Sequence, residues 1–326
     1  MKRRQVLGHF LGAAATAGFA FPVRAQEYPS RTIKIVVPYA AGGSPDIVVR
    51  ILAQPISAEL GQPVVVENLP GSSGIAAIEQ VKRATPDGYT LIDCDAGHWA
   101  VNPLIKKQLP YSFEKDLAPV SMLSTSALFL TVHESFPATN INEVVAAVKA
   151  KPGFYSYGSS GIGSLHHLTM EAFKAGLGLD ILHVPYKGTG QSVPALAAGQ
   201  VSMAIAAFNS VAPFAKAGKV RILAANTRER ASILKDYPPM GDAGLKDFHF
   251  PGENALFAPA ATPKAVIDKL AAAIGRAQKD PNTIAKLHAA GVEPPPTSTP
   301  AALAETIKRD IPRYQAAVKA AKVEPD

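Results

Sequence analysis

The sequence predicts an α/β protein of two units, each a mainly parallel sheet flanked by helices. Residues 33–94 alternate between β-branched runs and amphipathic helices, a pattern that favours parallel strands joined by right-handed crossovers. The alternation starts again after residue 127. Each unit has one glycine-rich turn between a strand and a helix, at residues 40–44 and 159–164. Two units of this kind predict a cleft between two lobes.

The first unit opens with a buried strand at residues 33–37, where Ile and Val dominate. Pro38 ends the strand, and Ala40-Ala41-Gly42-Gly43 forms a flexible turn. Ser44 is expected to be the N-cap of the following helix, with Pro45 at its first position. Apolar residues then recur at helical spacing as far as Leu60.

The turn at residues 40–44 predicts a cradle for a small anion. Backbone N–H groups at a helix N-terminus have no partner within the helix, and the helix dipole adds partial positive charge. On this stretch alone, a purely structural turn is the alternative. The spacing G-x-G-x-x-G is absent and no Gly-Lys-Ser/Thr follows, so the turn does not indicate a nucleotide site.

The rest of the first unit places a second turn at the same edge of the sheet. Strands are expected at residues 63–68 and 89–94, with a helix at 75–83 between them. Because parallel strands end at one edge, the turns at 40–44 and 95–99 are expected to lie together there. Open sheets of this class bind ligands at that edge.

The second unit and the C-terminal part continue the alternation. Strands are expected at residues 128–133, 155–158, 201–206 and 221–225, with another ending in 183–188, and helices at 141–150, 165–175 and 191–198. The C-terminal part should add a strand within 248–259 and helices at 263–279 and 300–321, with the rigid Pro294-Pro295-Pro296 run between these helices.

Residues 1–25 form the pattern of a cleavable export signal. Three basic residues at positions 2–4 precede an apolar run at 6–21, and a small-residue cleavage site ends at Ala25. The run is too short and too rich in glycine for a membrane anchor. We therefore expect a periplasmic protein, with the Sec and Tat routes both open.

Charge and cysteine content exclude several classes of protein. The formal charge is +7, but the signal contributes Lys2, Arg3, Arg4 and Arg24 and no acidic residue, which leaves +3 on the mature chain. That value argues against a nucleic-acid binder. Cys94 is the only cysteine, so no internal disulfide forms, and we expect it to be a buried, unreactive thiol. No Cys/His metal spacing is present, so no metal or cofactor is expected.

A series of short motifs resembles the Bug/TctC family, the periplasmic solute receptors of tripartite tricarboxylate transporters. They run in family order along nearly the whole mature chain. The matching stretches are Val36–Gly43 with Asp46, Gly61–Asn68 with Pro70-Gly71, Pro86–Leu91, Gly161–Ser164 with His167-Leu168, His183–Gly188, Gly199–Val201 and Ala217–Arg221.

The resemblance implies a two-lobed periplasmic-binding-protein fold of the flytrap type, similar to type II. The first lobe would comprise residues 26–126 and 231–326, and the second 127–230. The ligand would be a small carboxylate held between the lobes, often through ordered water, and delivered to transporter subunits in the membrane by a monomeric receptor. The implied ligand-binding residues are Tyr39, Ala40, Ala41, Gly42, Gly43, Ser44, Asp46, His98, Ser159, Ser160, Gly161, Gly163, Ser164, His167, Lys187 and Asn209.

Elementary chemistry agrees with that site. Unpaired N–H groups and serine hydroxyls satisfy a carboxylate without a buried arginine, and bridging water lets related acids share one scaffold. Asp46 would organise the first turn by accepting from its N–H groups rather than touch an anionic ligand. Tyr39 either stacks on the ligand or covers the turn. Lys187 is either a solvated turn residue or a cation of the cleft.

Three stretches depart from the family pattern. The family often has a Thr- or Ser-rich segment at residues 93–99, an aspartate at Asn209 and an aromatic pair within 252–254. His98 and Trp99 would suit an aromatic acid, although a packed Trp is the simpler expectation.

The spacing of residues in the sequence argues against a metal site and against a catalytic serine. His166 and His167 are adjacent, so on a helix they face different sides and do not chelate a metal as a pair. No G-x-S-x-G elbow accompanies the serines of residues 159–164, which argues against an acyl-transfer enzyme.

The leading hypothesis is a non-catalytic periplasmic receptor for a di- or tricarboxylic, amino or aromatic acid. The alternative is a sensor subunit that binds the solute and docks on a signalling protein. A neighbouring transporter gene would favour the first function, and a neighbouring sensor kinase gene the second. An enzyme is the third option, which turnover of a bound acid would support.

Overall fold

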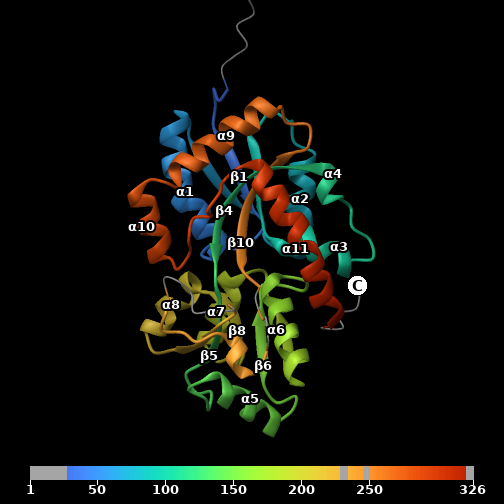
Figure 1. The fold of residues 1–326 in the computed structure, drawn as a ribbon, viewed down its shortest axis with the longest axis vertical. Coiled ribbons are helices and arrows are strands. Elements are labelled where there is room, and N and C mark those ends of the chain that lie inside the picture. The colour runs from blue at the N-terminus through green and yellow to red at the C-terminus, as the bar shows by residue number, and fades with distance from the viewer. Residues whose placement is uncertain (1–27, 228–233, 246–247, 249, 321–326) are drawn as a thin grey trace, which may run out of the picture.

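The computed structural model describes residues 28–227, 234–245, 248 and 250–320. The predicted export signal therefore lies outside the described residues. Two sheets form two lobes along the long axis of the molecule, with β1, β4 and β10 in the upper lobe and β5, β6 and β8 in the lower lobe (Figure 1). This confirms the predicted two-lobed α/β class.

The first sheet has the strand order β2-β1-β3-β10-β4. Strand β1 (Ile33–Val37) pairs in parallel with β2 (Val64–Asn68) and β3 (Thr90–Cys94), and Ile35 lies opposite both Val66 and Leu91. Strand β10 (Gly252–Pro259) runs antiparallel between β3 and β4 (Leu117–Ser126). The carboxyl ends of β1 and β3 therefore lie at one edge, as the alternation predicts.

The second sheet repeats this plan in the order β7-β6-β8-β5-β9. Strand β6 (Ser156–Ser159) is parallel to β7 (Leu182–Pro185) and β8 (Met203–Ala207). Strand β5 (Leu128–His133) is the antiparallel member between β8 and β9 (Val220–Ala225). Each sheet is thus mainly parallel with one reversed strand, and that strand is the one that enters from the other lobe.

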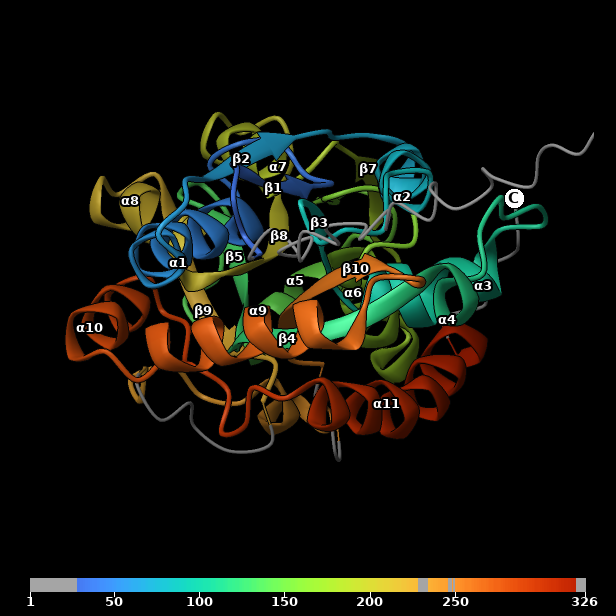
Figure 2. The ribbon, with the colours of Figure 1, turned by 90° about the horizontal axis from the view of Figure 1, so that it is seen from above.

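Helices cover both sheets, because their apolar faces need burial. Helices α9 and α11 both pack on β4, as the view from above shows (Figure 2), and α11 also contacts α6 of the second lobe. The helices are α1 (Ser44–Leu60), α2 (Ile75–Lys82), α3 (Asn102–Ile105), α4 (Phe113–Asp116), α5 (Ile141–Ala150), α6 (Leu165–Leu177), α7 (Thr189–Ala197), α8 (Phe208–Lys216), α9 (Lys264–Ala277), α10 (Pro281–Ala289) and α11 (Pro300–Ala320).

Two features of the elements differ from expectation. The N-cap of α1 is Gly43, in an extended conformation, and Ser44 is the first helical residue. The Ser44 hydroxyl instead accepts a hydrogen bond from Asn209 of the second lobe, 3.1 Å away. The sequence prediction also lacked β4, α8 and α10. Strand β4 contains Pro119 and several serines, and it is formed by pairing with β10, which lies far away in sequence.

The chain crosses between the sheets at β4–β5 and again before β10. Only Ala127 separates β4 from β5. After β9, residues 237–239 stay with the second sheet, since Ala225 N donates to Pro238 O and Ala225 forms a bridge with Pro239. The lobe boundaries at 126/127 and 230/231 stay predictions.

Apolar packing runs through both lobes. One cluster lies between the first sheet and helices α1 and α9 and includes Ile35, Leu52 and Ile274. A second cluster continues from the first lobe into the second and includes Trp99 and Tyr157. Cys94 is buried, as expected, and burial raises the pKa of its thiol. Within the described residues, no helix has the length and apolar character needed to cross a membrane.

Candidate functional site

The two glycine-rich turns each contact the opposite lobe, the first at residues 187–190 and the second at the turn after β2. Ala40 N, in the first turn, donates to Lys187 O, 3.4 Å away in the second lobe. A Cβ added to Gly43 would lie only 2.8 Å from Thr189 Oγ1, at the start of α7. A third contact is Ser73 Oγ, which donates to Ile162 O at 2.6 Å. The lobes are therefore closed on one another.

A cavity of about 550 Å³ lies between the lobes. Four residues of the predicted site line it: Tyr39, Ser160, Gly161 and Lys187. The other predicted site residues lie outside this lining, so their roles stay predictions. The remaining lining residues are Pro38, Gly71, Ser72, Ser73, Gly74, Ile75, Lys106, Ile162, Pro185 and Tyr186.

The first glycine turn is held by a buried aspartate. Asp46 Oδ2 accepts from Gly42 N at 2.9 Å, while Oδ1 accepts from Arg50 Nε and Asn68 Nδ2, each at 2.9 Å. Gly43 N donates to Ala40 O. Asp46 and the Ala40 carbonyl thus occupy the Gly42 and Gly43 N–H groups, two of those that the sequence analysis assigned to an anion.

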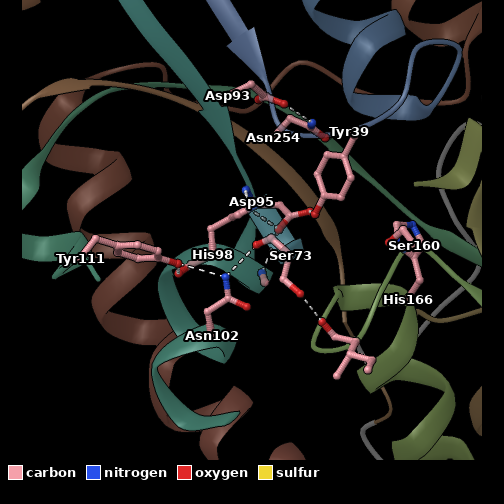
Figure 3. A network of polar contacts seen from close by, with 12 residues as sticks. Tyr39, Ser73, Asp93, Asp95, His98, Asn102, Tyr111, Ser160, His166 and Asn254 are labelled. Carbon is pink, nitrogen blue, oxygen red and sulfur yellow. Dashed lines mark hydrogen bonds and ion pairs between the residues drawn. The ribbon is translucent and has the colours of Figure 1, made fainter. Parts of the chain in front are cut away.

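A polar network lies at the end of β3, next to Tyr39 (Figure 3). Tyr39 OH donates to Asp95 Oδ2 at 2.7 Å, and Gly97 N donates to Asp95 Oδ1 at 2.9 Å. His98 Nδ1 lies 2.9 Å from the same Oδ1. Burial disfavours the charged form of Asp95, but His98 and the Tyr39 hydroxyl outweigh it and hold the pKa of the carboxyl below its usual value. Asp95 is therefore an ionised carboxylate.

Of the aromatic residues near Asp95, Tyr39 lines the cavity, whereas His98 and Trp99 are buried outside its lining. The His98 ring is buried against Tyr39, with ring centroids 5.5 Å apart, and His98 does not belong to the cavity lining. Trp99 packs on Phe113 and Phe257, which confirms the simpler expectation for it. Burial, followed by the Asp95 charge, raises the pKa of Tyr39, so its hydroxyl stays a donor.

The turn after β2 is a part of the lining that the site prediction omitted. Ser72 and Ser73 have left-handed backbone angles, φ 48° and 51°, which side chains rarely adopt. Asn102 Nδ2 fixes the turn by donating to Ser73 O at 2.9 Å and also contacts Tyr111 OH. The available signal was topological: residues 70–74 follow a parallel strand at the same edge as the two turns that were chosen.

The second glycine turn is supported by neutral histidines. Ser160 Oγ lies 2.7 Å from His166 Nδ1, and Gly163 N donates to His167 Nδ1 at 3.1 Å. Burial lowers the pKa of both histidines to about 4. Ser164 caps α6 by accepting from His167 N.

His183 completes the support of this turn from β7. Its Nε2 lies 2.7 Å from Ser159 Oγ, and its ring stacks on His167 with centroids 4.1 Å apart. Among the described residues, no group of three or more His, Cys, Asp or Glu side chains is placed to hold a metal. In the folded chain these three histidines contact the turn through hydrogen bonds and ring stacking.

Comparison with known proteins gives a family match over most of the chain. Residues 48–322 match the model described as "Tripartite tricarboxylate transporter family receptor". A "UPF0065 protein" of Bordetella pertussis is 37% identical over 275 residues, which cover 84% of this chain and 85% of that protein. "Protein BugT" from the same organism is 32% identical, with 93% of this chain and 94% of BugT covered.

Solved structures agree with the fold. A protein described as "Structure of a periplasmic transporter" is 40% identical with a TM-score of 0.87, covering 92% of this chain and 100% of that one. Rpa4515 of R. palustris, solved with adipate, has a TM-score of 0.89 at 30% identity and the same coverage. MatC of Rhodopseudomonas palustris, solved with bound malate, has a TM-score of 0.85 at 31% identity, covering 89% of this chain and 100% of MatC.

Proposed function

The chain belongs to the TctC family of tripartite tricarboxylate transporter receptors, and from this we propose that it captures a small organic acid between its lobes and delivers it to a membrane transporter. It acts as a receptor and leaves the acid chemically unchanged. The proposal includes export to the periplasm and removal of residues 1–25 after Ala25. It also includes membrane subunits of the tripartite tricarboxylate type as partners.

The observation that carries this proposal is the cavity between the two lobes. Its volume of about 550 Å³ suits a metabolite-sized ligand. Residues of both lobes line it, so a ligand there would bridge the lobes and favour the closed form. Two related structures, Rpa4515 and MatC, hold adipate and malate.

The charged residues of the cavity wall suit a carboxylate. Lys106 of the first lobe and Lys187 of the second both line it, and Ser160 of the second lobe adds a hydroxyl that is held by His166. Lysine is a mobile point charge that can follow acids of different shape.

A thermal-shift screen of the mature protein tests the function. We expect at least one acid among mono-, di- and tricarboxylates, amino acids and aromatic acids to stabilise it. A ligand at a hundred times its Kd should add roughly 2.7 kcal/mol to the free energy of unfolding.

Each acid is paired with its primary amide, which keeps the size and removes the charge. Stabilisation by the acid alone supports carboxylate capture. Stabilisation by no acid, or equally by acids and amides, would count against the proposed function.

A further inference from the structure

The turn after β2 holds four consecutive residues in a backbone conformation that only glycine adopts easily. Gly71, Ser72, Ser73 and Gly74 have positive φ angles of 114°, 48°, 51° and 77°. In the part of the chain that the structure describes, Ser72 and Ser73 are the only residues other than glycine with positive φ. A residue with a side chain pays free energy for this conformation and keeps it only where the surrounding structure holds it in place.

The first lobe holds this turn at two points. Asn102, which is buried, donates from Nδ2 to Ser73 O at 2.9 Å. Gly74 lies against the His98 ring, and a Cβ added to Gly74 would collide with that ring. The backbone that carries the Ser73 side chain is therefore fixed before the lobes meet.

Across the lobes, the Ser73 hydroxyl bonds one end of a peptide group whose other end is already held. Ser73 Oγ donates to Ile162 O at 2.6 Å (Figure 3). The same peptide group presents Gly163 N, which donates to His167 Nδ1 at 3.1 Å within the second lobe. Because hydrogen bonds in a chain polarise one another, the bond to His167 makes the carbonyl a better acceptor for Ser73.

This contact also forms part of the cavity wall, since Ser73 and Ile162 both line the cavity. At 2.6 Å it is shorter than the bond between the lobes from Ala40 N to Lys187 O, at 3.4 Å. When the lobes separate, the bond from Ser73 to Ile162 must break. Its breaking opens the wall between the ligand and the solvent.

We propose that Ser73 is a latch between the lobes: its bond to Ile162 O holds the closed form and thereby slows release of the ligand. The inference rests on the proposed function and adds to it a positioning residue that acts through closure. Both groups of the latch belong to the protein, so it works with or without a ligand in the cavity. The rigid turn presents the hydroxyl in advance, which reduces the entropy lost on closure.

Single-molecule fluorescence energy transfer on the mature protein tests the latch by measuring the rate at which closed molecules open. The dyes are attached at Thr85→Cys in the first lobe and Gln200→Cys in the second, both exposed positions, while the buried Cys94 stays unlabelled. Ser73→Ala should raise the opening rate about two- to tenfold, the usual net effect of losing one hydrogen bond. The increase should be the same without ligand and with the acid that gives the largest thermal shift, starting from adipate and malate.

Ser57→Ala is the matched control. Ser57 Oγ also donates to a backbone carbonyl, Gln62 O at 2.9 Å, but both groups lie in the first lobe. Its replacement should leave the opening rate unchanged. Ser73→Gly is the second variant if Ser73→Ala folds poorly, because glycine removes the same hydroxyl and adopts the left-handed backbone without strain.

The outcomes separate the latch from the receptor function. Equal opening rates in the Ser73 and Ser57 variants, or no closed molecules of the wild type without acid, would overturn the latch and leave the receptor function intact. An increase seen only with the acid would also overturn it, because Ser73 would then act by binding the ligand. If no acid binds, the receptor function fails, whereas the opening rates without ligand still decide on the latch.

Discussion

His166, His167 and His183 surround the second glycine turn as neutral side chains. Burial is the main reason, and it lowers their pKa values to about 4, 4 and 3 from an ordinary 6.5. In the unfolded chain these side chains bind protons below pH 6.5, whereas in the folded chain they do so only near pH 4 and below. The folded state therefore loses stability as the pH falls from about 6.5 through 4.

We predict that the free energy of unfolding, measured with urea between pH 4 and 7, falls toward acid with an uptake of more than one proton. His183→Gln keeps a hydrogen-bonding group near Ser159 and should reduce that uptake by up to one proton. His133→Gln, at an exposed Nδ1–Ser135 contact, serves as the control. If His183→Gln leaves the loss of stability toward acid pH unchanged, then His183 is not a source of the proton uptake, which would contradict the prediction.

At the scale of an element, β10 and α11 meet through a buried pair of carboxyl groups. Glu253 of β10 lies beside Asp310 of α11, which is ion-paired with Arg309 at 2.9 Å and Arg313 at 3.1 Å. Burial, followed by the charge and hydrogen bond of Asp310, raises the pKa of Glu253 to about 8. Because the arginines pair with Asp310, Glu253 is the member of the pair that holds the proton.

The consequence is a second pH dependence, opposite in sign to that of the histidines and still present above pH 6.5, where theirs has ended. An acid whose pKa is raised on folding stabilises the protein fully below its unfolded value of 4.5, loses that contribution progressively as the pH rises, and has lost it once the pH passes about 8. We predict that the free energy of unfolding falls between pH 6.5 and 8.5 with a slope of up to about 1.4 kcal/mol per pH unit. Glu253→Gln should flatten this limb, and Glu305→Gln, exposed on the same helix, should not.

The elements predicted from sequence were those with a local signal. Strand β1, helix α5 and strand β5 have the predicted bounds, because their apolar runs or caps are complete within a few residues. Strand β4 has no such signal and depends on β10, more than a hundred residues away. The same distinction holds in the site. The glycine turns can be recognised in the sequence, whereas the hydrogen bond from Tyr39 to Asp95, 56 positions apart, exists only in the folded chain.

At the scale of the whole molecule, closure depends on small residues at the contact between the lobes. Gly190 in α7 lies directly against the first glycine turn, and a Cβ there would collide with the carbonyl oxygen of Ala41. In an isolated helix, Gly→Ala is favourable by roughly 0.5–1 kcal/mol. In this protein, Gly190→Ala therefore has two opposite effects. Helix propensity favours the alanine, whereas its Cβ collides with Ala41 O only when the lobes are closed.

We predict that Gly190→Ala keeps the fold but opposes closure, so that the thermal shift produced by any stabilising acid becomes smaller. Small-angle X-ray scattering with that acid should give a larger radius of gyration than for the wild type. Gly275→Ala in α9 is the matched control, because the nearest atom to an added Cβ there is 3.9 Å away. Equal radii and equal thermal shifts in the two variants would contradict the role of Gly190.

The reversed strand in the first sheet also fixes an order of assembly. Strand β4 joins that sheet only through β10, which is encoded after the entire second sheet. A chain that emerges from its N-terminus can therefore complete the sheet formed by residues 128–225 before the one that begins at residue 33. The lobe that starts first is finished last, and until residue 259 arrives, β3 and β4 present unpaired edges.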